Sequence, residues 1–177
     1  DEFERILVNT VKEFYGDDPG KSPDLGRMIN DRHFERVAGL IDKARVLVGG
    51  QTDAGQRYIA PTLLKNVSMD DAIMQEEIFG PVLPILTYSS MDELVGNLKK
   101  LPEHPLALYL FTASEQVERQ VLDNTQFGGG CINNTMMHVA NPHLPFGGVG
   151  ESGMGAYHGR SSFDAFSHQR SILKAST

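Results

Sequence analysis

Residues 82–132 read VLPILTYSSMDELVGNLKKLPEHPLALYLFTASEQVERQVLDNTQFGGGCI, and this stretch decides the fold class. Apolar runs of strand length at Val82–Tyr88, at Leu106–Phe111 and at the end of the stretch alternate with two helical patterns, which begin after Ser90 and Ser114. Such alternation predicts right-handed crossovers between parallel strands. We therefore expect an α/β fold with a parallel, doubly wound sheet and flanking helices.

The segment before this stretch predicts two helices and short strands. Apolar residues recur at helical spacing over Phe3–Phe14, and no N-cap precedes them, so we expect that the chain is cut from something longer. A second apolar stripe covers Leu25–Ile41. A short strand is expected at Arg45–Val48, and an edge strand or extended segment at Tyr58–Leu64, which contains a proline. Because no repeat or linker interrupts the sequence, we expect one α/β unit.

The composition excludes several classes of protein. The chain has 177 residues, of which 40% are hydrophobic, and a formal net charge of −7, as in a folded globular chain. An acidic chain has no positive field for phosphate groups, so neither nucleic acid nor a membrane is expected as a partner. No apolar run approaches the roughly 20 residues that span a bilayer. A single cysteine and the lack of a secretion leader favour the cytoplasm.

A Gly-rich loop covers Asn133–Gly159, and we expect it at the carboxyl edge of the sheet, where α/β proteins bind ligands. Gly148–Gly153 matches the dinucleotide pattern G-x-G-x-x-G, but no strand precedes it and no helical pattern follows. We interpret it as a tight loop. The six histidines and one cysteine lack metal-ligand spacing, so no metal site is expected.

Cys131 permits two interpretations. As a nucleophile it would need a nearby base, for which His138 is the candidate. A lone cysteine after a glycine run is more often a small, buried core residue. We favour burial.

Gln75–Pro81 reads QEEIFGP and places two carboxylates and an aromatic ring just before a buried strand. A carboxylate here can accept hydrogen bonds from sugar hydroxyls, while the ring packs on a ribose or a flat heterocycle. The alternative is a carboxylate at a helix end and a phenylalanine in the core. Physical arguments alone do not decide between the two.

Three long runs together resemble the NAD(P)-dependent aldehyde dehydrogenases. They are MQEEIFGPVLPI at Met74–Ile85, LPFGGVGESGMGAYHG at Leu144–Gly159 and FDAFSHQR at Phe163–Arg170, and the last two look most like the class 3 branch. With shorter matching segments, the resemblance covers essentially the whole chain. It implies an oxidoreductase that oxidises aldehydes to carboxylic acids with NAD or NADP through a cysteine thiohemiacetal.

The resemblance also implies that residues 1–177 are a C-terminal portion of the family's catalytic domain. The family's catalytic cysteine follows a glycine-containing motif that Cys131 does not match, and the general-base glutamate and the cofactor domain lie upstream in relatives. We therefore predict that this chain holds no catalytic residue and is inactive alone. From Phe166 onward it resembles the start of a strand that relatives use for dimer contacts, which implies a homodimer.

Four site residues are implied by the resemblance. Glu77 binds the hydroxyls of the nicotinamide ribose, and Phe79 packs beside that ribose. Phe146 lines the aldehyde channel, which His138 approaches from the preceding loop. Glu76 does not match the ribose-binding position, so a structural role such as an ion pair is expected for it.

Two functional classes stay open. The first is a part of an aldehyde-oxidising enzyme, and the alternative is a natural truncated, non-catalytic relative that serves as a binding or dimerisation module. A thiol hydrolase dependent on Cys131 is a distant third. The first two differ in whether the gene encodes a cofactor domain and a nucleophile upstream of Asp1.

Overall fold

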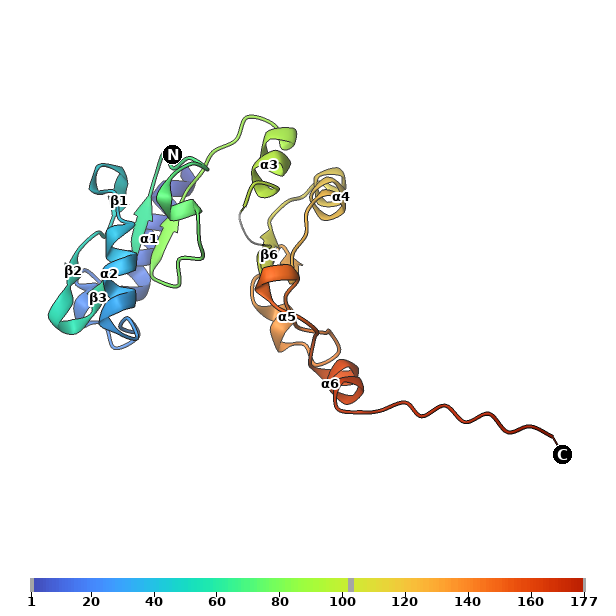
Figure 1. Cartoon of the computed structure of the whole chain (residues 1–177). Coiled ribbons are helices and arrows are strands. Elements are labelled where there is room, and N and C mark those ends of the chain that lie inside the picture. The colour runs from blue at the N-terminus through green and yellow to red at the C-terminus, as the bar shows by residue number, and fades with distance from the viewer. Residues whose placement is uncertain (1, 102–103, 177) are drawn as a thin grey trace. The chain divides into compact units, whose positions relative to one another are not determined.

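A computed structural model describes residues 2–101 and 104–176, and the chain divides into two compact units between Ser89 and Ser90 (Figure 1). This differs from the single α/β unit predicted from the sequence. The first unit contains α1 (Glu2–Tyr15), α2 (Asp31–Gly39), β1 (Val46–Val48), β2 (Thr52–Asp53), β3 (Tyr58–Ile59), β4 (Thr62–Leu64) and β5 (Val82–Pro84), with short 3-10 turns at Pro19–Lys21, Lys43–Arg45, Ala54–Gln56 and Ala72–Met74. The second contains α3 (Met91–Leu98), β6 (Ala107–Leu110), α4 (Glu115–Asn124), β7 (Gly129–Ile132), α5 (Met137–Ala140), a 3-10 turn at Gly150–Ser152 and α6 (Gly159–Ala165).

The first unit is built on a three-stranded sheet with the order β1-β4-β5. β1 is antiparallel to β4, whereas β4 and β5 are parallel, with Thr62 opposite Val82. β4 is therefore the central strand and all three of its residues are buried, so the predicted edge position is wrong for Thr62–Leu64. It is right for Tyr58–Ile59, because among the described residues β3 pairs only with β2, in a two-stranded sheet. The proline is tolerated because Pro61 lies just before the strand, where no ladder hydrogen bond is needed from it.

Helix α2 covers the core of this unit. Phe34 and Val37 point into a cluster of buried apolar side chains that also includes Ile59 and Leu64, and Val37 is fully buried. Burying such a side chain contributes roughly 1.5–3 kcal/mol relative to leaving it exposed. The helix is shorter than the predicted stripe because the side chain of Asn30 accepts a hydrogen bond from the backbone N–H of His33 at 2.9 Å and so fixes the start of α2.

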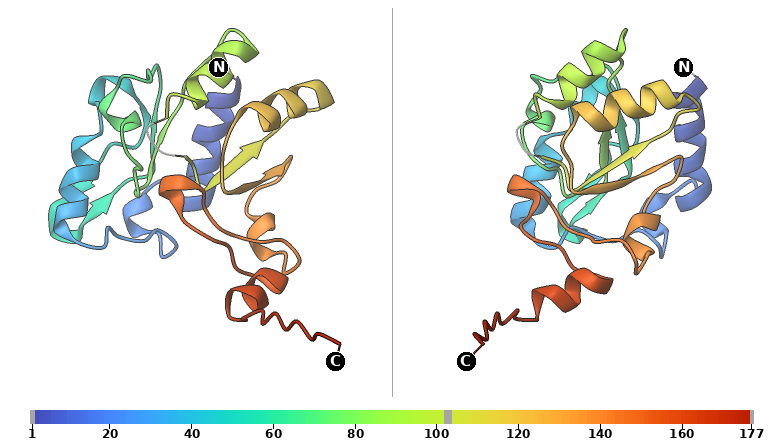
Figure 2. Two further views of the ribbon diagram at one scale, coloured as in Figure 1. Left: turned by 45° about the vertical axis from the view of Figure 1, so that its right-hand side comes forward. Right: turned by 90° about the vertical axis from the view of Figure 1, so that its right-hand side faces the viewer.

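The second unit confirms the predicted alternation of strands and helices. β6 and β7 are parallel, paired from Ala107–Gly129 to Leu110–Ile132, and α4 connects them (Figure 2). The hydroxyls of Ser90 and Ser114 accept hydrogen bonds from backbone N–H groups at the starts of α3 and α4, as predicted. The α/β class is confirmed. Of the three predicted strands, β5 lies in the first unit, where it pairs with β4, and β6 and β7 pair with each other in the second unit.

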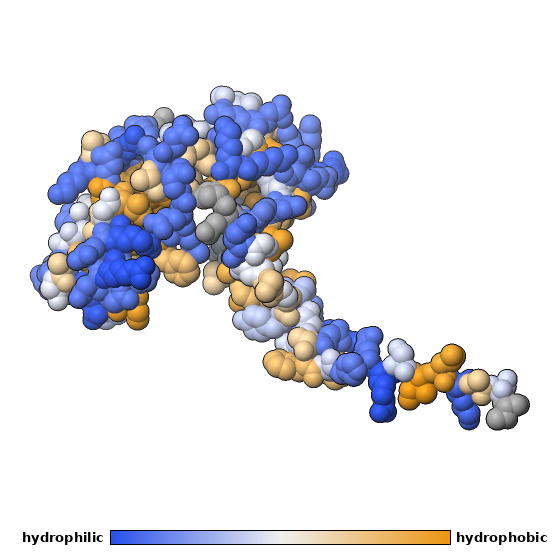
Figure 3. All heavy atoms as spheres, viewed as in Figure 1, coloured by the Kyte–Doolittle hydropathy of each residue, from blue (hydrophilic) through white to orange (hydrophobic). Residues whose placement is uncertain are grey.

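Residues 167–176 contain no helix or strand, and their side chains are exposed. Ile172 and Leu173 are 77% and 98% exposed, and apolar side chains stand out along this tail in Figure 3. The predicted dimer strand falls in this segment and stays a prediction.

Candidate functional site

The turn between residues 75 and 80 carries two glutamates in different surroundings. Oε1 of Glu76 lies 2.9 Å from Nη1 of Arg36 in α2, which confirms the predicted ion pair. The side chain of Glu77 is exposed, and across residues 2–101 and 104–176 no hydrogen bond or ion pair reaches its carboxylate. A free carboxylate accepts several hydrogen bonds through its two oxygens. Of the two glutamates, Glu77 is therefore the one available to a ligand.

Phe79 lies on the same turn and is 74% exposed, so the interpretation as a core phenylalanine is wrong for this chain. Its φ of 47° is in the left-handed region, which costs of the order of 1–3 kcal/mol in a residue other than glycine. Gly80 follows, and an added Cβ there would lie 2.7 Å from Cγ1 of Val37. The turn therefore packs tightly on α2, and this packing holds the strained backbone of Phe79.

In the second unit, Phe146 and His138 lie together, as the resemblance implies. Their ring centroids are 5.7 Å apart at an interplanar angle of 56°. The ring centroid of Tyr109 in β6 lies 5.7 Å from that of His138, while those of Tyr157 and His158 lie 5.8 and 6.0 Å from that of Phe146. These five residues form an aromatic cluster. The role of Phe146 and His138 in substrate binding stays a prediction, and Tyr109, Tyr157 and His158 are neighbours that the sequence analysis did not single out.

The backbone of the Gly-rich loop holds Phe146 in place. Phe146 and Tyr157 exchange two backbone hydrogen bonds of 2.9 Å, which close the loop as an antiparallel bridge. A Cβ on Gly147 or Gly148 would collide with the backbone of Gly155 or of Ser152, respectively. The prediction of a tight loop that needs glycine is confirmed, and the reason is close approach of two backbone segments.

Cys131 lies next to the aromatic cluster. Its Sγ is 3.6 Å from Nδ1 of His138, within hydrogen-bond reach for sulfur, and Cys131 is half-buried in β7. The structure thus places the thiol of Cys131 next to the imidazole of His138, as the nucleophile interpretation requires. Cys131 is only partly buried, so the burial interpretation holds in part. A catalytic pair needs a third group to orient the base. Nε2 of His138 is buried and has no hydrogen-bond partner among the described residues.

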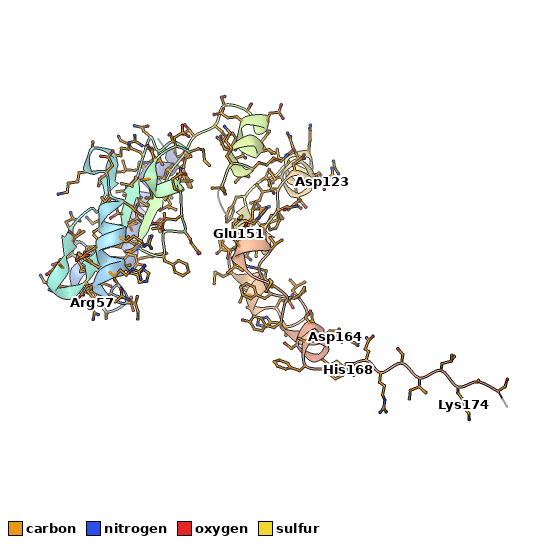
Figure 4. All side chains as sticks on the ribbon, in the orientation of Figure 1. Arg57, Asp123, Glu151, Asp164, His168 and Lys174 are labelled. Atoms are coloured by element: carbon orange, nitrogen blue, oxygen red, sulfur yellow. The ribbon has the colours of Figure 1, made fainter. Side chains whose placement is uncertain are left out.

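A hydrogen bond between two side chains ties the Gly-rich loop to the segment before β6. Oε2 of Glu151, which is labelled in Figure 4, lies 2.9 Å from Nδ1 of His104. The hydrogen bond from His104 lowers the pKa of the Glu151 carboxyl below its ordinary value of 4.5, because it stabilises the charged form. A lowered pKa means that the stabilisation is present above pH 4.5 and is lost as the pH falls through the pKa of folded Glu151.

We expect a carbon-detected NMR titration to give a pKa below 4.5 for Glu151, and His104→Ala to move it up toward 4.5. His143→Ala, a change of the same kind at an exposed position, is the control and should leave the Glu151 titration unchanged. An unaltered Glu151 titration in His104→Ala would contradict the contact.

Neither a metal-binding group of side chains nor a membrane-spanning helix is found in the described residues. Over residues 2–101 and 104–176, no three side chains of His, Cys, Asp or Glu are grouped so that they could hold a metal ion. No helix in the same ranges is both long and apolar enough to cross a lipid bilayer.

Comparison with known proteins identifies the family. Residues 1–172 match the sequence profile of the aldehyde dehydrogenase family. The chain belongs to this family. It is 51% identical over 179 residues to the 4,4'-diaponeurosporen-aldehyde dehydrogenase of Staphylococcus aureus, covering 100% of this chain and 39% of that protein. It is 53% identical over 167 residues to aldehyde dehydrogenase family 3 member B1 of Rattus norvegicus, covering 94% and 36%, which agrees with the class 3 resemblance.

Solved structures that resemble this aldehyde dehydrogenase chain are also aldehyde dehydrogenases. A substrate-bound structure of Staphylococcus aureus AldH matches it with a TM-score of 0.90 and 47% identity, over 99% of this chain and 40% of that one. A succinate-semialdehyde dehydrogenase from Burkholderia pseudomallei matches with a TM-score of 0.81 and 26% identity, over 94% and 35%. The chain therefore spans between 35 and 40% of the lengths of these relatives.

Proposed function

We propose that this chain supplies the nicotinamide-ribose contacts and part of the aldehyde channel of an enzyme that oxidises aldehydes to carboxylic acids with NAD or NADP. The observation that carries the proposal is the turn at residues 76–79. There the carboxylate of Glu77 is exposed and has no hydrogen-bond or ion-pair partner in the described part of the chain, Phe79 is exposed beside it, and Glu76 is paired with Arg36. An acceptor of two hydrogen bonds next to a free ring fits a ribose with two hydroxyls.

The family implies a nicotinamide dinucleotide, and this turn fits one. The dinucleotide supplies a hydride acceptor when bound. Glu77 would accept hydrogen bonds from the ribose hydroxyls and so fix the direction of the sugar, while the ring of Phe79 would cover the ribose and exclude water. Correct alignment of reacting atoms is worth orders of magnitude in rate, which is why fixing the sugar matters.

Phe146 and the aromatic cluster around it would form an apolar wall for the aldehyde. Phe146 is half-buried and its neighbour His138 is 6% exposed, so Phe146 would meet the substrate while His138 supports the ring from behind. The attacking thiolate would come from outside residues 1–177, because Cys131 does not match the family's cysteine motif.

We also propose that the complete enzyme is a cytoplasmic homodimer. The exposed Ile172 and Leu173 support the dimer, because an interface core would cover such side chains. Light scattering on the complete enzyme should give twice the mass of its subunit, whereas a monomer mass would contradict the dimer.

The proposal is tested with a complete enzyme that contains residues 1–177 of this sequence, by following aldehyde-dependent formation of NADH or NADPH. We expect turnover with at least one of the two cofactors. An enzyme that is folded by circular dichroism but reduces neither cofactor with any aldehyde in a series of chain lengths would contradict the proposal.

In the same enzyme we expect Cys131→Ala to leave aldehyde oxidation within a few fold. The change removes a half-buried thiol and one weak contact to His138, which costs stability of about 1 kcal/mol and no chemical step. Turnover lost with the fold intact would show that Cys131 is a nucleophile after all.

A further inference from the structure

Arg36 of α2 contacts three consecutive residues of the turn that carries Glu77 and Phe79. Its Nη1 donates to Oε1 of Glu76 at 2.9 Å and to the backbone carbonyl of Glu77 at 3.4 Å. Its Nη2 donates to the backbone carbonyl of Ile78 at 2.6 Å. One guanidinium therefore holds the two peptide groups on either side of the Cα of Ile78.

The second anchor of the turn comes from the next residue of the same helix. Val37 lies so close to Gly80 that a Cβ there would be only 2.7 Å from its Cγ1. Between the two anchors lies Phe79, with its left-handed backbone. A bulky residue keeps such a conformation only where the surroundings enforce it. Arg36 on one side and Val37 on the other provide that enforcement.

The bonding capacity of arginine suits this task. A guanidinium is planar and presents several N–H donors in a rigid fork, so it can donate to three acceptors at once, whereas a lysine ammonium is a point charge on a flexible stem. The side chain of Arg36 is 26% exposed, and ion pairs of this kind contribute little to global stability. The burial of α2 rests on Phe34 and Val37. The bonds of Arg36 therefore act chiefly on the turn.

We propose that Arg36 is a positioning residue for the cofactor. It does not touch the ribose but fixes the backbone from which the carboxylate of Glu77 and the ring of Phe79 project. This inference rests on the proposed function of Glu77 and Phe79. It also assigns roles to both glutamates, since Glu76 anchors the guanidinium and Glu77 is left free for the ligand.

The test compares Arg36→Gln with Arg32→Gln in the complete enzyme. Arg32 lies one turn earlier on α2, its side chain is exposed, and among the described residues no hydrogen bond or ion pair joins it to the turn, so the control makes the same change on the same helix without removing such a contact. We expect Arg36→Gln to lower kcat on the order of tenfold through misalignment. A primary isotope effect with deuterated aldehyde should appear, while Arg32→Gln keeps the parental rate. Melting temperatures of the two variants should be similar.

A double variant shows whether Arg36 acts through Glu77. If it does, Arg36→Gln combined with Glu77→Gln is about as slow as the slower single variant, because the second change disturbs a contact already lost. Effects on kcat that multiply would show that Arg36 acts independently and would overturn the inference.

Failure of this inference and failure of the proposed function give different results. If the Glu77→Gln variant is slow and the Arg36→Gln variant has the parental kcat, the positioning role of Arg36 is overturned and the ribose assignment stays intact. A parental kcat in the Glu77→Gln variant removes the ribose assignment itself.

If Arg36→Gln does not fold, Arg36→Lys is measured instead. It keeps the charge but loses the fork, so it should also be slowed, and a parental rate with no isotope effect would overturn the inference.

Discussion

Purified alone, this chain is expected to form no NADH or NADPH from octanal or benzaldehyde. The family's reaction needs a thiolate that attacks the aldehyde, and losing that group removes the covalent route itself. The single cysteine of the chain, Cys131, does not match the family's motif and is half-buried beside His138. The measurement is the absorbance of reduced cofactor, with the complete enzyme as the positive control.

Cofactor reduction that survives repurification and is abolished by Cys131→Ser would contradict this expectation. Nε2 of His138 would then be the place to look for the missing third group of a catalytic set, because it is buried without a partner among the described residues.

An inactive chain is also what a natural non-catalytic relative would give. The gene upstream of Asp1 separates the two cases, because a continuous reading frame with a cofactor domain and a nucleophile identifies a part of an enzyme.

Glu77→Gln in the complete enzyme is expected to slow aldehyde oxidation on the order of tenfold to a hundredfold. The change keeps the shape of the side chain but removes charge-assisted hydrogen bonds, each worth roughly 1.5–3 kcal/mol when formed. Cofactor binding should weaken less than the rate falls, because the proposed upstream domain still holds the adenosine end. Slower hydride transfer should expose a primary isotope effect with deuterated aldehyde.

Glu76→Gln is the matched control for this prediction. Glu76 is already paired with Arg36. Replacing it with glutamine keeps the two hydrogen bonds from Arg36 to backbone carbonyls, so we expect a smaller loss of rate than in Glu77→Gln. If Glu76→Gln showed both defects and Glu77→Gln showed neither, the assignment would be off by one residue. If neither change affected catalysis, the pair would be structural.

The elements that the sequence predicted well depend on local signals. Ser90 and Ser114 cap their helices as expected because an N-cap needs only a hydroxyl and a backbone N–H three residues later. The position of β4 in its sheet could not be predicted in this way. It is central because β1 and β5 pair with it from both sides, and a proline at its start gives no information about such partners.

The candidate site was predictable from motifs only in part. The resemblance identified Glu77 and Phe79 on one turn, but their exposure and the pairing of Glu76 follow from packing against α2. Arg36 is 40 residues away from Glu76 in the sequence, so no spacing rule connects the two. Tyr109 was missed for a related reason, since it reaches His138 from β6, 29 residues before it in the sequence.

The most direct test of the central claim is a crystal structure of the complete enzyme with NAD or NADP bound. The account predicts that both carboxylate oxygens of Glu77 lie within hydrogen-bond distance of the nicotinamide-ribose hydroxyls, with the ring of Phe79 against the same sugar and Glu76 still paired with Arg36. A cofactor whose nicotinamide ribose is held by other residues, with Glu77 facing solvent, would contradict it.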